Sequence, residues 1–125
     1  MLKYTTICVL IIWSFQMIAQ DYSEHLKVFI DCDHCDQEQI RQELSSVDYV
    51  YDKFQANLHL LITQQGTGSG GREINVTFIP NMLPGLETFT LTTHTPGDAT
   101  YDMVREKILG TIRYGLTPFL FSTGQ

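Results

Sequence analysis

The sequence predicts an α+β fold, a two-layer sandwich whose elements follow in the order β-α-β-β-β-α. Four short apolar runs are typical of strands and cover residues 26–30, 58–63, 74–78 and 87–93. Two further segments repeat apolar residues at helical spacing and cover 36–47 and 95–115. Because a βαβ start is followed by a hairpin, we expect a mixed sheet with both helices on one face.

The first predicted strand leads through a turn into the first predicted helix. Leu26, Val28 and Ile30 share one face of the strand. Asp36 is the expected N-cap of the helix, and Gln39 stands three residues later, as a capping box requires. After this helix, residues 48–57 are compatible with a short extended piece.

A glycine-rich loop over 64–72 separates the second and third predicted strands, which we expect to pair as an antiparallel hairpin. Residues 66–71 formally match the pattern G-x-G-x-x-G. A dinucleotide site needs a helix directly after the last glycine, whereas residues 72–76 are typical of a strand. The loop is therefore interpreted as a hairpin connection.

The second predicted helix has clear local boundaries. Thr95 is the expected N-cap, and Pro96 suits the first helical position. Gly115 is the expected end, and Pro118 should prevent the helix from continuing.

Residues 1–20 are typical of a secretory signal peptide. Lys3 supplies a short basic start, residues 7–18 are mostly apolar, and Ala19 provides a small residue near the cleavage point. We expect one periplasmic α+β domain over 21–121, and a tail, or the start of a missing C-terminal region, over 122–125. The signal predicts export from the cytoplasm.

The charge balance excludes some classes of partner. The full sequence has a formal net charge of −6, and removal of the signal would take away Lys3 and lower this to about −7. Binding to nucleic acid needs a basic face, so no nucleic-acid partner is expected. Electrostatic docking on an anionic bilayer is disfavoured as well, so contact with the outer membrane is expected by association only.

Three cysteines occur in the chain, and Cys8 lies within the predicted signal. The remaining pair, Cys32 and Cys35, is expected to form a disulfide in an oxidising compartment. An alternative is a thiol–disulfide oxidoreductase with Cys32 as the nucleophile and Cys35 as the resolving thiol. Asp31, Asp33 and Asp36 weigh against this alternative, because nearby negative charge disfavours a thiolate.

A metal site at the same turn is the second alternative. Asp31, Cys32, His34 and Cys35 are all potential ligands. A structural zinc site needs a second pair of ligands elsewhere, and the sequence offers no second pair of cysteines or histidines at suitable spacing. No cofactor is therefore expected.

Four groups of residues stand out together: Val28–Cys32 with Cys35-Asp36, Tyr49–Lys53, Ala56–Thr63 and Gly66–Glu73. As a set they resemble the amino-terminal domain of a poorly characterised family of exported Bacteroidota-type proteins. In that family the domain precedes an outer-membrane β-barrel-like region, which implies a location in the periplasm or on the periplasmic side of the outer membrane. The resemblance implies no enzymatic activity and no catalytic residue.

From these observations we expect a non-catalytic exported domain, an interaction or accessory module of an outer-membrane β-barrel protein. Its expected partner is another envelope protein or its own missing C-terminal barrel region. An enzyme is disfavoured because no convergent catalytic set is visible, with the Cys32–Cys35 pair as the one alternative.

Overall fold

The computed structural model describes residues 25–122, so the predicted signal peptide lies outside the described residues. The prediction of an α+β fold in the order β-α-β-β-β-α is confirmed, with one additional two-residue strand. The elements are β1 (Lys27–Cys32), α2 (Gln37–Glu43), β2 (Asp48–Tyr49), the 3₁₀ helix η2 (Lys53–Gln55), β3 (Leu58–Gly66), β4 (Arg72–Pro80), β5 (Phe89–Thr95) and α3 (Tyr101–Ser122).

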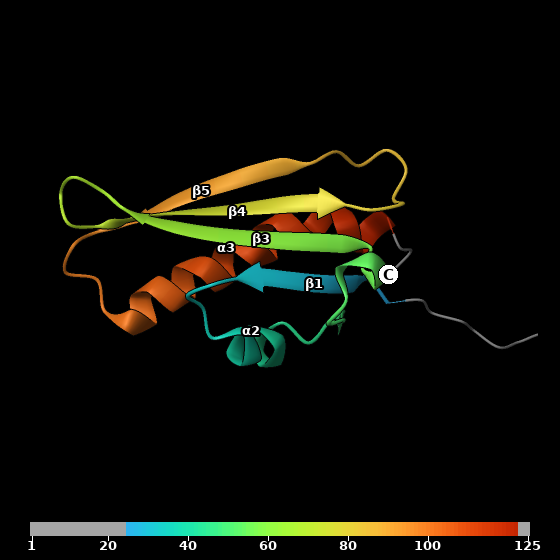
Figure 1. Cartoon of the computed structure of the whole chain (residues 1–125), viewed down its shortest axis with the longest axis horizontal. Helices are drawn as coiled ribbons and strands as arrows, with labels where there is room; N and C mark the ends of the chain where they lie inside the picture. The colour runs from blue at the N-terminus through green and yellow to red at the C-terminus, as the bar shows by residue number, and fades with distance from the viewer. Residues whose placement is uncertain (1–24, 123–125) are drawn as a thin grey trace, which may run out of the picture.

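The five strands form one mixed sheet in the order β2-β1-β3-β4-β5 (Figure 1). β1 runs parallel to both of its neighbours, β2 and β3. β3, β4 and β5 form an antiparallel meander, so the predicted hairpin around the glycine-rich loop is confirmed. β2 and β5 are the two edges of the sheet within residues 25–122.

The core lies between one face of this sheet and the helices. α3 crosses behind the strands, and α2 lies beside the end of β1 (Figure 1). Because side chains alternate along a strand, one face of β1, β3 and β4 points toward the helices, and its central residues are buried. Both helices contribute side chains to the same core. Its largest fully buried members are Phe78, Phe119, Leu26, Leu58, Leu60, Ile74, Leu109 and Ile112.

The opposite face of the sheet is largely polar. Hydroxyl groups pair across the strands, with 2.9 Å between Thr77 and Thr90 and 2.6 Å from the Thr92 hydroxyl to Asn75. The Asn75 side chain also donates to Glu73 at 3.1 Å, and this hydrogen bond lowers the pKa of the Glu73 carboxyl. Hydrogen-bonded pairs of this kind stabilise a sheet without a second layer over it.

The first helix is shorter than predicted. Its N-cap is confirmed, because the Asp36 side chain accepts from the Gln39 amide at 3.2 Å. The helix ends at Glu43, however. Val47 belongs to the loop that follows, and its side chain is still buried in the core. The reason is the short strand β2: the Asp48 amide donates to the Leu26 carbonyl at 2.9 Å, so the chain must leave the helix early to reach β1.

The start predicted for the second helix is wrong. Thr95 is the last residue of β5, where it pairs with Arg72, and α3 begins at Tyr101. Thr100 caps the helix instead, accepting from the Met103 amide at 3.2 Å. The pairing of β5 with β4 therefore overrides the local capping signal at Thr95 and Pro96.

The end predicted for the second helix is also wrong, because α3 continues through Gly115 and Pro118 to Ser122. A Cβ atom at Gly115 would overlap with the ring of Phe78, so glycine is needed there for close packing of the helix on the sheet. One turn later, Phe119 is fully buried and stacks with Phe78 and Phe89. Burial of this last turn outweighs the helix-stop signals.

Within the described residues, no helix is sufficiently long and apolar to pass through a bilayer.

The packing at Gly115 gives a first prediction. Gly115→Ala should lower the free energy of unfolding by about 1–3 kcal/mol, because the added methyl group overpacks against Phe78. Gly68→Ala is the control: nothing described lies within 4 Å of the added Cβ and its φ is outside the left-handed region, so it should raise stability by about 0.4–1 kcal/mol. Urea unfolding of both variants checks this, and equal effects at the two positions would contradict it.

Tyr49 gives a second prediction, in alkaline solution. Its hydroxyl donates to the Leu44 carbonyl, and burial raises the pKa of Tyr49 from 10.0 to about 12. The unfolded side chain ionises first, so the stabilisation is complete below pH 10 and is lost between pH 10 and pH 12. Tyr49→Phe should flatten the fall of unfolding free energy in this interval, whereas Tyr51→Phe, at an exposed position, should not.

Candidate functional site

The disulfide between Cys32 and Cys35 closes the turn between β1 and α2. The two Cα atoms are 5.8 Å apart, within the usual range for a disulfide. The Gln37 side chain donates to the Cys32 carbonyl at 3.1 Å, and Asp36 caps α2 directly after the bridge. These contacts hold the end of β1, the turn and the start of α2 together. The disulfide lies where the sequence predicted it.

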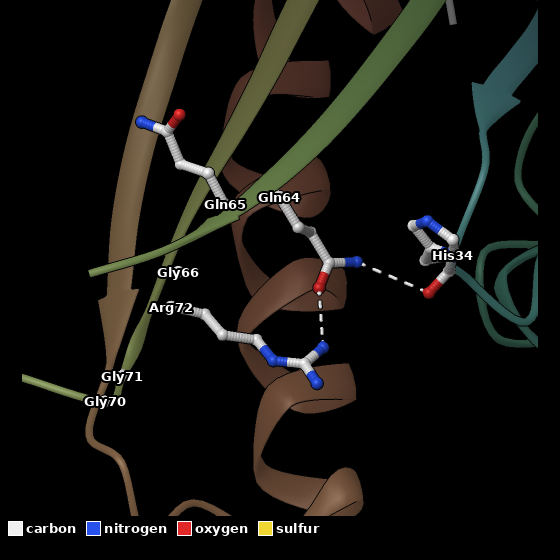
Figure 2. A pocket seen from close by; sticks show the side chains of 7 residues that line it. All are labelled: His34, Gln64, Gln65, Gly66, Gly70, Gly71 and Arg72. Atoms are coloured by element: carbon white, nitrogen blue, oxygen red, sulfur yellow. Dashed lines mark hydrogen bonds between the residues drawn. The ribbon is translucent and has the colours of Figure 1, made fainter. Parts of the chain in front are cut away.

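Gln64, near the end of β3, connects this turn to the β3–β4 hairpin. Its amide nitrogen donates to the His34 carbonyl at 3.4 Å, and its oxygen accepts from the Arg72 guanidinium at 3.1 Å (Figure 2). The Gln65 side chain points away from this pair, because successive residues of a strand face opposite sides. The depression between turn and hairpin has a volume of about 540 Å³.

On the α3 side of the disulfide turn, the space is almost filled. A cavity of about 30 Å³ lies between the turn and the first part of α3. Apolar side chains of α2 and α3 line it, among them Ile40, Val104 and Ile108. A volume of this size has room for about one water molecule, so it is not a substrate pocket.

The structure does not bring the predicted metal ligands together. Asp31 lies on the polar face of the sheet, where its carboxylate is 3.4 Å from His59 of the neighbouring β3. Cys32, the next residue, packs against the core on the opposite face. Strand alternation therefore separates the two, and the disulfide occupies both sulfur atoms. No group of three or more acidic, histidine or cysteine side chains suited to a metal ion occurs in residues 25–122.

The glycine-rich loop is a tight hairpin connection, as its sequence predicted. The Thr67 amide donates to the Gly71 carbonyl, and the Gly70 amide donates to the Thr67 carbonyl. Gly70 has a φ of 87°, a conformation that favours glycine. A Cβ at Gly71 would overlap with the Thr95 carbonyl, so the loop packs tightly against the end of β5. The Thr67 and Gly70 amides therefore already have backbone partners.

A second candidate site, not predicted from the sequence, lies along β5. Within the described chain, β5 pairs only with β4, so its other edge carries unpaired backbone groups. The strand contains no Asp, Glu, Lys or Arg. Edge strands in soluble proteins are usually guarded by such charges, by proline or by a bulge. This edge, together with the groove between β5 and α3, is called the β5 edge site.

A groove runs between the β5 edge and α3, with a volume of about 410 Å³. Its strand side consists of Leu91, Thr92 and Thr93. Its helix side consists of Glu106, Lys107, Gly110, Thr111 and Tyr114. An open edge beside a helix is the arrangement to which extended segments bind by β-strand addition.

No protein-family model, curated protein or solved structure matches this chain. The resemblance to an exported Bacteroidota-type family stays a prediction, and function is inferred from the residues of this chain alone.

The disulfide gives a third prediction. Replacing both Cys32 and Cys35 with serine should lower the free energy of unfolding by about 2 kcal/mol, since a short closed loop restricts the unfolded chain only modestly. Urea unfolding of this variant, beside the parent chain with and without reductant, measures the effect. Retention of the fold with a loss near this size is expected; complete unfolding on reduction would contradict a merely local role.

Proposed function

We propose that this chain is a non-catalytic protein-interaction domain of the cell envelope that binds its partner at the β5 edge site. The observation that carries the proposal is the uncharged, singly paired edge of β5 beside a groove lined by α3. Backbone groups along such an edge form hydrogen bonds with any extended partner, and the groove adds side-chain specificity.

The chemistry of the disulfide turn supports a non-catalytic role. Both sulfur atoms are joined to each other, and His34 contacts Gln64 through its backbone carbonyl. Asp31, which the sequence indicates as a potential metal ligand, is paired with His59 on the opposite face of the sheet. The turn therefore presents a rigid surface rather than a nucleophile with an adjacent base.

The proposal includes export of the chain to the periplasm, or to the periplasmic side of the outer membrane. The signal-like residues 1–20 and the bonded pair of cysteines both support it, because disulfides persist in oxidising compartments. The proposed partner is another envelope protein or a β-barrel region belonging to the same protein. The formal net charge of −6 favours a protein partner over nucleic acid.

A thiol–disulfide oxidoreductase is the second candidate, because the bonded pair lies between a strand and a helix N-terminus. A redox titration of Cys32 and Cys35 distinguishes the two functions. A potential below about −300 mV marks a structural disulfide, as the interaction proposal expects. A potential between about −270 and −120 mV, with selective alkylation of Cys32, would favour the enzyme.

The interaction proposal gives a fourth prediction, tested in the envelope of cells that express the full chain. A photo-crosslinking residue at Thr93, in the groove, should form an adduct with a protein of the envelope fraction. The same photo-crosslinking residue placed at position 42, where Gln42 lies on the exposed side of α2, is the matched control and should form no adduct.

Export gives a further expected result. Mass spectrometry of the isolated chain should show a new N-terminus after residue 20.

Two results would overturn the proposal. One is a chain that stays in the cytoplasm with residues 1–20 intact. The other is an exported chain whose Thr93 position gives no adduct beyond that of the Gln42 control.

A further inference from the structure

We propose that the occupant of the β5 edge site is a second copy of this chain. In this dimer, β5 pairs with β5 in antiparallel orientation, about a two-fold axis that passes near Thr92 and Gly110. The inference rests on the proposed function, because it keeps the same site and names a second copy of this chain as the envelope protein that occupies it.

Gly110 is the first observation that points to a close partner. It lies within α3, where glycine costs about 1 kcal/mol relative to alanine. Nothing in the described chain lies within 4 Å of a Cβ built at this position, so the fold itself does not require glycine there. Gly115 in the same helix contrasts with it, because the ring of Phe78 fills the space of its missing side chain. An unneeded helical glycine on a groove is suited to close approach of another backbone.

The position of Gly110 is the second observation. It lines the groove together with Leu91, Thr92 and Thr93. These three residues are the middle of β5, which runs from Phe89 to Thr95. A two-fold axis through the middle of the strand therefore passes close to the glycine as well, at the point where the two copies of α3 come nearest.

The sequence of β5 is compatible with self-pairing. With Thr92 opposite Thr92, Leu91 lies opposite Thr93 on the helix side, and Thr90 lies opposite His94 on the polar side. Because the strand contains no Asp, Glu, Lys or Arg, no like charges meet across the new ladder. Threonine and leucine pairs of this kind suit a half-buried sheet surface.

The exposed face of α3 is also self-complementary about Gly110. Antiparallel helices that cross there place Glu106 and Lys107 of one copy near Tyr114 of the other, since these lie about one turn to either side of the glycine. Tyr114 is 76% exposed and offers a hydroxyl donor and an aromatic face. The carboxylate of Glu106 can accept from the hydroxyl, and the Lys107 ammonium can lie over the ring. In this arrangement Glu106 and Lys107 of one copy meet the tyrosine of the other copy, and not a side chain of like charge.

The first test measures the mass of the full chain in solution by sedimentation equilibrium, after purification from whichever cell fraction holds it. We expect a dimer in the micromolar range. Gly110→Arg should weaken it by at least about tenfold, because two bulky like charges would meet at the axis. Gln42→Arg, on the exposed side of α2, is the matched control and should leave the dimer unchanged. The helix tolerates Arg at position 110, where open space surrounds the Cα atom.

A second test fixes the register of the paired strands. Thr92→Cys should give a disulfide-linked dimer under mild oxidation, because each new thiol faces its own copy across the axis. Thr90→Cys should not, since its expected neighbour is His94. The native Cys32–Cys35 pair is already bonded and serves as an internal reference.

A chain that is monomeric throughout this range, or a dimer that Gly110→Arg does not weaken, would overturn the inference. If the monomeric chain still gave the Thr93 adduct with a different envelope protein, the proposed function would stand and only the identity of its partner would change. If no adduct formed with any protein, itself included, both would fail.

Discussion

The close approach of α3 to β4 is the contact on which the remaining architecture depends. Gly115 removes the side chain that would keep helix and sheet apart, and the ring of Phe78 occupies the vacated space. Phe119 then stacks with Phe78 and Phe89, and this aromatic group ties the helix to two strands at once. Dense packing of this kind holds α3 in one position across the sheet, which in turn sets the distance between its exposed face and the edge of β5.

The comparison of sequence and structure shows where local signals suffice. The hairpin around the glycine-rich loop, the Asp36 cap and the disulfide each depend on residues close in sequence, and all three were predicted. The limits of α3 were not, because pairing with Arg72 places Thr95 in a strand and burial of Phe119 extends the helix past Gly115. These causes lie far away in the sequence, beyond the reach of capping and helix-stop rules.

The candidate sites differ in the same way. The pair of cysteines is visible in the sequence, but the placement of Asp31 on the opposite sheet face follows only from the register of β1. The β5 edge site depends on strand order, since a strand becomes an edge only when the whole sheet is assembled. The one signal that could have indicated it is the absence of charge in residues 89–95, which is unusual for an edge but ordinary for an inner strand.

The place of β1 in the sheet has a consequence for the order of events during synthesis. β1 is the first strand of the described chain, yet it lies inside the sheet between β2 and β3. Until residues 58–62 have been made, it lacks its longer neighbour. The two cysteines, only three positions apart, need no such wait and can be joined as soon as both reach an oxidant. Closing this bond therefore does not depend on the hydrogen-bonded ladder, and a bridge that forms first leaves the far end of β1 turned toward α2 before its later neighbours pair with it.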